Sequence, residues 1–136
     1  MRAWVLGSGH SLKQRTPEWF AARAAAGDMV IGVNAAIEEY ASCMTDYVII
    51  DMQCPDNWCA LALELIKPGH FYMLDLAATR KNTVGTHAVI FTRRGGIEWD
   101  RTFDGSLPMG HTVTFCAIHI ALAAGADTVV LVGVDL

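Results

Sequence analysis

Short apolar runs alternate with helix-forming segments along this chain, and this alternation constrains the fold more than any other feature of the sequence. The apolar runs predict five β-strands, near residues 2–6, 29–33, 47–50, 70–74 and 128–132. Strands that alternate with helices need right-handed crossover connections, which make neighbouring strands parallel. The sequence therefore predicts one α/β domain over residues 1–136, a Rossmann-like three-layer fold with a mostly parallel sheet.

Helix start and stop signals lie between these strands. Thr16 is a favourable N-cap, Pro17 suits the first turn, and Gly27 ends the helix that they open. Further helices are expected at 35–40, 55–66 and 112–124. The last of these is apolar almost all round, so we expect it to be buried, with His119 as a hydrogen-bonded core histidine. Residues 77–86 look turn-rich, residues 88–91 could form another strand, and residues 95–108 are expected to form a loop or hairpin.

Composition and charge exclude several classes of protein. Apolar residues make up 53% of the chain and charged residues 18%, a bias typical of parallel strands that are covered on both faces. The net charge of -4 argues against nucleic acid as a partner, which would need clustered basic residues. The longest apolar segment, 115–126, is too short to span a bilayer, so no membrane partner and a cytoplasmic location are expected. The four cysteines lack zinc-site spacing and are expected to be free, mostly buried thiols.

A polar residue follows nearly every predicted strand. In open α/β sheets the ligand binds outside the carboxyl ends of the strands, so these residues together predict one cleft. Each of them alone could instead be a turn residue or a helix cap. The residues concerned are Gly7-Ser8, Asn34, Asp51, Asp75 and Asp135.

The loop Gly7-Ser8-Gly9-His10-Ser11 comes directly after the first strand. Small residues let backbone N–H groups approach a phosphate or carboxylate closely, so a side chain at Gly9 is expected to block that approach. The loop is not a dinucleotide fingerprint, because the position that would need the third glycine is Leu12. A plain tight turn remains the alternative.

A second candidate anion site lies at the start of the buried helix, in the segment 109–114. Gly110 allows a sharp entry into the helix, Thr112 can cap it, and the N–H groups of its first turn are free to bind an anion. His111 could donate a proton or a hydrogen bond to a phosphate. The alternative is an ordinary N-cap on a buried helix.

Two segments of the chain resemble the family 42 bacterial sialyltransferases and the related MptE-like 6-hydroxymethylpterin diphosphokinases. Residues 5–12 are similar to their opening strand and Gly-x-Gly-Pro-Ser-Leu loop, with His10 in place of the proline. Residues 110–136 look like their second signature, a small-residue turn, a buried helix and a strand that ends in Gly-x-Asp. Asn34 stands where those families place an asparagine after the second strand. Short phage-encoded proteins of this group have a similar length.

The resemblance implies a nucleotide-linked ligand. In the sialyltransferases the first loop and the asparagine contact the nucleotide and phosphate of a sugar donor, and the small-residue turn contacts the sugar acid. These roles would fall on residues of this chain as follows: Gly7, Ser8, Gly9, Ser11 and Asn34 for the nucleotide, and Gly110, His111 and Thr112 for the sugar. The MptE-like enzymes transfer diphosphate from ATP with magnesium, for which Asp51, Asp75 and Asp135 could supply ligands.

The chain departs from the sialyltransferase pattern in one respect. Their general base is a histidine beyond the Gly-x-Asp strand, so this chain would be a fragment, a small form without transferase chemistry, or an enzyme with another base. His10, His111 and Asp135 are the candidate catalytic residues. The leading expectation is a glycosyltransferase-like protein that binds a nucleotide sugar. The alternatives are a non-catalytic nucleotide-binding or sequestering protein and a Mg²⁺-dependent diphosphokinase-like enzyme. A homo-oligomer is an open option for each of them.

Overall fold

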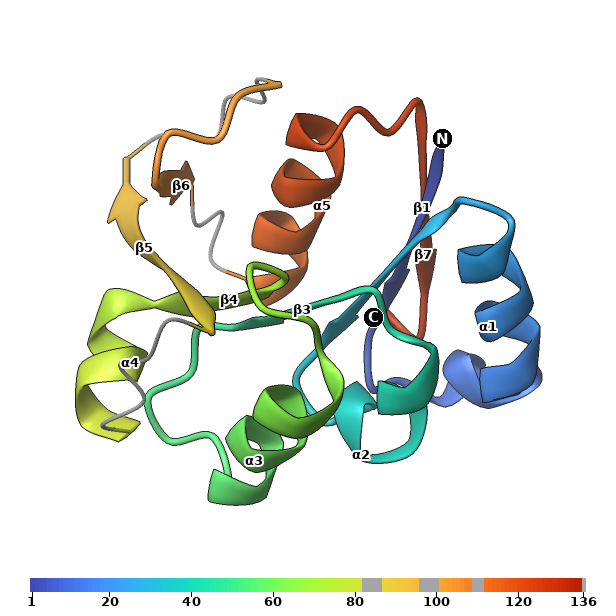
Figure 1. The fold of residues 1–136 in the computed structure, drawn as a ribbon, viewed down its shortest axis with the longest axis horizontal. Coiled ribbons are helices and arrows are strands. Elements are labelled where there is room, and N and C mark those ends of the chain that lie inside the picture. The colour runs from blue at the N-terminus through green and yellow to red at the C-terminus, as the bar shows by residue number, and fades with distance from the viewer. Residues whose placement is uncertain (82–86, 96–100, 109–111, 136) are drawn as a thin grey trace.

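The predicted apolar runs form strands of a single sheet in the computed structural model, which describes residues 1–81, 87–95, 101–108 and 112–135. Within these residues the sheet has seven strands in the order β6-β5-β4-β3-β2-β1-β7, and every neighbouring pair is parallel (Figure 1). The strands are β1 (Arg2–Leu6), β2 (Met29–Val33), β3 (Asp46–Ile49), β4 (Phe71–Leu74), β5 (Ala88–Arg94), β6 (Ser106–Pro108) and β7 (Thr128–Val132). The fold is therefore a Rossmann-like α/β fold, as the sequence predicts.

The order of the strands determines which face each helix covers. From β1 to β5 the chain steps along the sheet in one direction, so right-handed crossovers place α1 to α4 on one face. The connection from β6 back to β7 runs in the opposite direction, so α5 covers the other face, as Figure 1 shows. The helices are α1 (Pro17–Ala25), α2 (Ala36–Tyr40), α3 (Asp56–Leu65), α4 (Asp75–Lys81) and α5 (Val113–Ala123), with short 3-10 helices η1 (His10–Gln14) and η2 (Ala41–Cys43).

Side-chain caps begin the two helices for which the sequence predicts them. The Thr16 hydroxyl accepts a hydrogen bond from the amide of Trp19 at 3.3 Å, at the start of α1. The Thr112 hydroxyl accepts one from the amide of Phe115 at 3.2 Å, at the start of α5. Each cap satisfies one of the amides that a helix leaves unpaired at its N-terminus.

The core lies on both sides of the sheet and includes most of α5. Cys116, Ala117 and Ala121 are fully buried, as expected for a helix that is apolar all round. His119 is also fully buried, and its Nε2 lies 3.1 Å from the carbonyl oxygen of Thr102, which confirms its prediction as a hydrogen-bonded core histidine. All four cysteines are free and buried. Among the described helices, none has the length and hydrophobicity needed to cross a membrane.

Two segments differ from the sequence prediction. Residues 75–81 form helix α4, where the sequence favoured a turn-rich segment from residue 77, because Asp75 at its first position and Arg80 and Lys81 in its last turn suit the helix dipole. Residues 106–108 form β6, which pairs in parallel with β5, so the prediction of a loop or hairpin over 95–108 was wrong for these three residues, while residues 96–100 lie outside the described residues. A three-residue edge strand that ends in Pro108 is too short to produce a periodic pattern.

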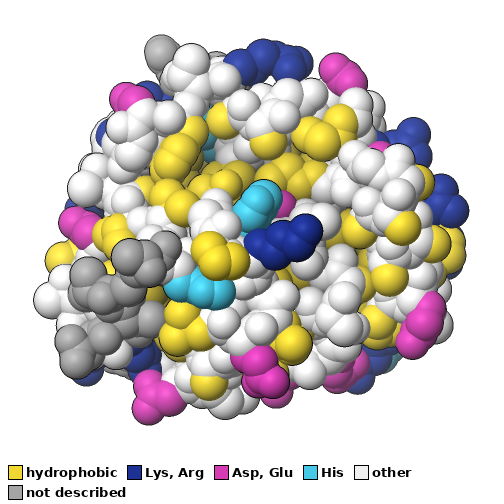
Figure 2. Space-filling model, in the orientation of Figure 1, with side chains coloured by type: hydrophobic (Ala, Val, Ile, Leu, Met, Phe, Trp, Pro, Cys, Tyr) yellow, Lys and Arg dark blue, Asp and Glu magenta, His cyan; other side chains and the backbone are white. Residues whose placement is uncertain are grey.

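One face of the molecule carries many exposed apolar side chains. Figure 2 shows hydrophobic side chains across the middle of this face, with acidic side chains placed mainly toward its periphery. The large exposed hydrophobic residues of the described chain include Leu63 and Leu65 of α3 and Leu131 of β7.

Candidate functional site

The polar residues that follow the strands lie at one edge of the sheet. Because all described strands are parallel, the loops after β7, β1, β2, β3 and β4 leave from the same carboxyl edge, in that spatial order. The strand ends that the sequence predicts to lie together therefore do lie at one edge of the sheet. The loops that carry this edge contain Asp135, Gly7-Ser8, Asn34, Asp51 and Asp75 in turn.

The glycine loop after β1 packs directly against the loop after β7. The amide of Gly7 donates to the carbonyl of Val132 at 2.8 Å, and the amide of Gly9 donates to the carbonyl of Gly133 at 2.6 Å. A Cβ atom on Gly9 would lie 2.6 Å from the Gly133 oxygen, and Gly133 itself has a φ of +71°. The glycines therefore permit close approach of two backbone segments of the same chain.

Ser11 and Asp135 join the same two loops through their side chains. The Asp135 carboxylate accepts hydrogen bonds from the Ser11 hydroxyl and, at 2.8 Å, from the Ser11 amide. The Ser11 hydroxyl in turn accepts from the amide of Gly133 at 3.0 Å. The bonds from Ser11 lower the pKa of the Asp135 carboxyl. A carboxylate that is held ionised in this way is a weak general base.

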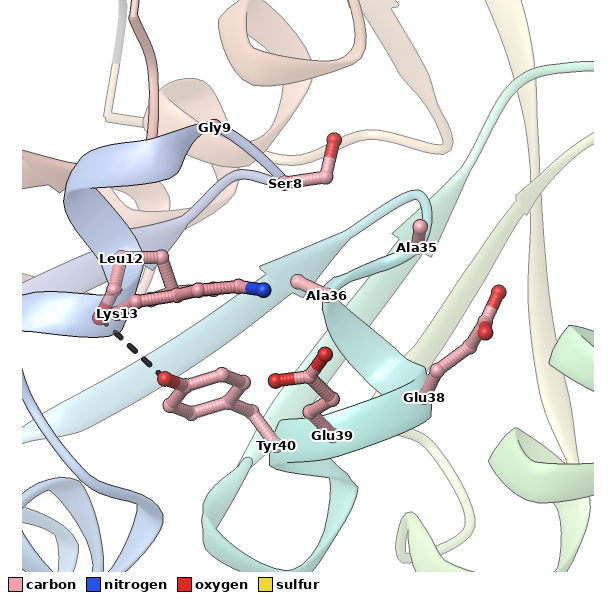
Figure 3. Close-up of a pocket in the computed structure, with 9 residues that line it drawn as sticks. All are labelled: Ser8, Gly9, Leu12, Lys13, Ala35, Ala36, Glu38, Glu39 and Tyr40. Carbon is pink, nitrogen blue, oxygen red and sulfur yellow. Dashed lines mark hydrogen bonds between the residues drawn. The ribbon is translucent and has the colours of Figure 1, made fainter.

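These contacts limit the role of the glycine loop in anion binding. The amides of Gly7, Gly9 and Ser11 already donate to groups of the β7 loop, and the amide of Leu12 donates to the carbonyl of Gly9 at 3.1 Å. Ser8 is exposed and is one of the residues that line a cavity beside the loop (Figure 3). The loop can therefore offer a ligand its Ser8 side chain, whereas most of its amides hold the fold together.

Asn34 has an unusual backbone conformation at the end of β2. Its φ of 51° lies in the left-handed region of backbone conformation. Among the described residues, every other residue with a positive φ is a glycine. Its carbonyl oxygen accepts hydrogen bonds from the Tyr47 hydroxyl at 2.9 Å and from the amide of Ile37 at 3.4 Å. The residue is half-buried. The strained turn places the start of α2 beside the glycine loop, because β1 and β2 are neighbours in the sheet.

Asp51 and Asp75 have local roles in the structure. The Asp51 carboxylate accepts from the amide of Gln53 at 2.8 Å, which closes a turn after β3. Asp75 is the first residue of α4, and its carboxylate accepts from the amide of Leu76 at 2.7 Å. Within the described residues, no three His, Cys, Asp or Glu side chains lie close enough together to hold a metal ion. The carboxylates proposed as magnesium ligands are therefore not assembled into such a group.

A cavity of about 180 Å³ lies between the glycine loop and α2, at the carboxyl ends of β1 and β2. Figure 3 shows the Lys13 side chain extending from η1 toward α2, with the Glu39 carboxylate below it. Tyr40 forms the floor, and its hydroxyl donates to the carbonyl oxygens of Leu12 and Arg15 at 3.3 and 2.9 Å. Glu38 also lines the cavity, but its carboxylate accepts from the Trp58 indole at 2.6 Å.

The cavity therefore presents two charged groups of opposite sign to a ligand. No hydrogen-bonding partner is found for the Lys13 ammonium or the Glu39 carboxylate among the residues that the structure describes. The sequence pattern indicated neither residue. It points to the residues that directly follow each strand, whereas Lys13 and Glu39 lie six residues further along from Gly7 and Val33 respectively, on the first helical turns after the loops.

Part of the second candidate anion site lies outside the described residues. Gly110 and His111 belong to that part, and Thr112 caps α5 as described above. The N-terminus of α5 follows the carboxyl end of β6, so it lies at the same edge of the sheet as the glycine loop. Thr112 is not among the residues that line the cavity beside the glycine loop. His10, the remaining histidine candidate, is exposed in η1.

The chain was compared with protein-family models, with curated proteins and with solved structures, and none of the three comparisons gave a match. The resemblance to the sialyltransferases and the MptE-like enzymes therefore stays a prediction. What the structure itself shows is a Rossmann-like α/β fold with a cavity at the carboxyl edge of its sheet.

Proposed function

We propose that the protein binds a nucleotide or nucleotide-linked ligand at the carboxyl edge of the sheet. One observation carries the proposal: the cavity between η1 and α2 presents the Lys13 ammonium and the Glu39 carboxylate together, and neither has a partner among the described residues. An ammonium binds phosphate oxygens, and a carboxylate near the end of the second strand accepts hydrogen bonds from ribose hydroxyls. Nucleotides carry both groups a few ångströms apart.

The size of the cavity indicates which part of the ligand it holds. At about 180 Å³ it is smaller than the roughly 300–1,000 Å³ of sites that enclose a whole ligand. We therefore assign it to the ribose and the adjoining phosphate, with the rest of the ligand extending along the carboxyl edge past Ser8 and Asn34. The four free, buried thiols fit a reducing compartment, so we place this function in the cytoplasm.

Binding can be tested by thermal unfolding with CMP, UDP, GDP and ATP, each with and without Mg²⁺. A nucleotide present at 100 times its Kd should stabilise the protein by about 2.7 kcal/mol. Lys13→Met should abolish the preference for CMP over cytidine, because only the phosphate has lost its partner. Glu39→Gln should abolish the preference for CMP over 2′-deoxy-CMP. Lys67→Met, at the opposite edge of the sheet, is the matched control and should bind as the parent does. Absence of any shift across the panel would reject the proposal.

A transferase is the second candidate function, favoured by the exposed position of His10 beside the carboxyl edge. Asp135 is engaged by Ser11 and has a lowered pKa, which leaves His10 as the better candidate base among the described residues. Release of CMP or UDP from the corresponding nucleotide sugars should then be measurable. His10→Gln should abolish this turnover and leave the thermal shift with CMP unchanged. Binding without turnover of any donor would identify the protein as a non-catalytic binder.

A further inference from the structure

A second cavity lies at the opposite, amino-terminal edge of the sheet and takes no part in the site described above. Its volume is about 490 Å³, within the range of sites that bind small organic molecules. Its walls come from α1, η2, the end of α3 and the residues that precede β3 and β4. His70 lines the cavity and forms a pair with the buried Asp46, and no part of the proposed nucleotide site uses this pair.

The sheet register brings Asp46 and His70 together. Tyr47 is paired with Phe71, and the Tyr47 amide donates to the His70 carbonyl at 3.0 Å, so Asp46, the first residue of β3, lies next to His70, which precedes β4. The Asp46 side chain is only 3% exposed, and its Oδ1 lies 2.9 Å from Nδ1 of His70. Its Oδ2 accepts from the Thr45 hydroxyl at 2.6 Å. Both carboxylate oxygens are therefore occupied by groups of the protein.

The buried carboxylate leaves one nitrogen of His70 available. Nδ1 faces Asp46, and the ring is 48% exposed, so Nε2 is the nitrogen that His70 can offer to the cavity that it lines. A histidine whose other nitrogen is held by a carboxylate has a fixed tautomer and a fixed ring orientation. Burial raises the pKa of the Asp46 carboxyl, and the hydrogen bonds from Thr45 and His70 oppose that effect.

Besides His70, Lys67 also lines this cavity and brings an ammonium group to it. No Asp or Glu is among the described residues that line it. Burial raises the pKa of the Cys43 thiol, from η2, to about 11, so that group is uncharged at neutral pH. The cavity beside the glycine loop differs, because Glu38 and Glu39 line it.

Apart from Ser42 and Thr45, the remaining lining residues of the cavity are apolar or carry the uncharged Cys43 thiol. Ala21 and Ala24 are the two residues that α1 contributes, and Leu65 lines the cavity at the end of α3. Leu65 is 46% exposed, which leaves apolar surface uncovered in the cavity that Lys67 and His70 also line. Such a combination fits a ligand with one anionic group and a compact apolar body.

We propose that the amino-terminal cavity binds a small organic acid, with its carboxylate on the Lys67 ammonium and His70 Nε2 and its apolar body against Ala24 and Leu65. In this arrangement Nδ1 of His70 stays on Asp46 and Nε2–H donates to the ligand carboxylate, and no covalent bond forms or breaks.

The proposal is tested by calorimetric titration of the protein with benzoate and hexanoate, using benzamide as a neutral analogue of similar shape. We expect saturable binding of at least one acid and at least tenfold weaker binding of benzamide. His70→Gln and Lys67→Met should each weaken binding of the acid at least tenfold.

Lys13→Met is the matched control, because it removes a lysine from the other cavity and should bind both acids as the parent does. Both His70 and Lys67 lie at the surface, so these variants should fold. Absence of saturable binding of both acids would overturn the proposal. Equal binding of benzoate and benzamide, or parental affinity in both variants, would overturn it as well. Each result is independent of whether nucleotides bind at the carboxyl edge.

Discussion

The substitution Gly9→Ala tests whether the glycine loop is needed for contact between β1 and β7 or for contact with a ligand. Gly9 has φ -72° and ψ 165°, a conformation that alanine adopts without strain. Its effect is therefore steric only. The added Cβ would lie 2.6 Å from the Gly133 oxygen and 2.7 Å from Oδ2 of Asp135.

The magnitude follows from these distances. Ordinary van der Waals contact begins at 3.4 Å, so the two loops must separate by several tenths of an ångström. That movement weakens the bond from the Gly9 amide to Gly133 and the bonds from Ser11 to Asp135. Overpacking costs about 1–3 kcal/mol, and each weakened hydrogen bond about 1 kcal/mol. We expect a loss of about 3 kcal/mol, which lowers the Tm of a domain of this size by roughly 10 °C.

The assay is urea unfolding and thermal unfolding of the free protein, without any ligand. Gly95→Ala is the control, because a Cβ there would meet no atom within 4 Å, and it should change the stability by less than about 0.5 kcal/mol. If Gly9→Ala retained parental stability and lost only nucleotide binding, the loop would be reserved for the ligand. The role of the glycine loop in joining β1 to β7 would then be refuted.

Two further predictions concern α5 and the pH dependence of stability. Ile120→Asp places a carboxylate in the core and should lower the free energy of unfolding, measured with a chemical denaturant, by more than about 4 kcal/mol. Ala60→Asp, on the exposed side of α3, is the control and should lower it by less than about 0.5 kcal/mol. Similar losses in both variants would contradict the burial of α5. The pKa of Asp135 is lowered in the folded protein, so its contribution is complete above the unfolded value of about 3.9 and is lost as the pH falls through the folded value. Asp135→Asn should therefore be less stable than the parent at pH 7, and the two should converge in acid; a constant difference from pH 7 to pH 2 would contradict this.

Much of the fold could be predicted from the sequence because the strands are short and bounded by clear signals, and the inner strands β1 to β4 are mostly buried. Predicted strands at 2–6, 29–33 and 128–132 have the same limits in the structure, and the two others differ by one residue. A fully buried parallel strand is apolar at every position, as in β2, so it is visible without a repeating pattern. The edge strand β6 was missed because three residues at a sheet edge carry no such signal.

The candidate site was harder to predict than the fold. The sequence identified the edge of the sheet, since polar residues at the ends of parallel strands must lie together. It could not show that Ser11 and Asp135, 124 residues apart, are partners of each other. It also gave no reason to select Lys13 or Glu39, because a charged residue on a short helix usually faces solvent. Which charges share a cavity depends on the packing of η1 against α2, which a local pattern does not encode.

The pairing of β1 with β7 has a consequence for folding during synthesis of the chain. β1 is one of the inner strands of the sheet, yet one of its edges gains a partner only when Thr128–Val132 has been made. At about 5–20 residues per second, the 126 residues from Leu6 to Val132 take roughly 6–25 s to synthesise. Throughout that time Ala3 and Val5, both fully buried in the folded protein, lie on a strand with an open edge. A chaperone that recognises short apolar segments would find its binding site there, on β1 of the nascent chain.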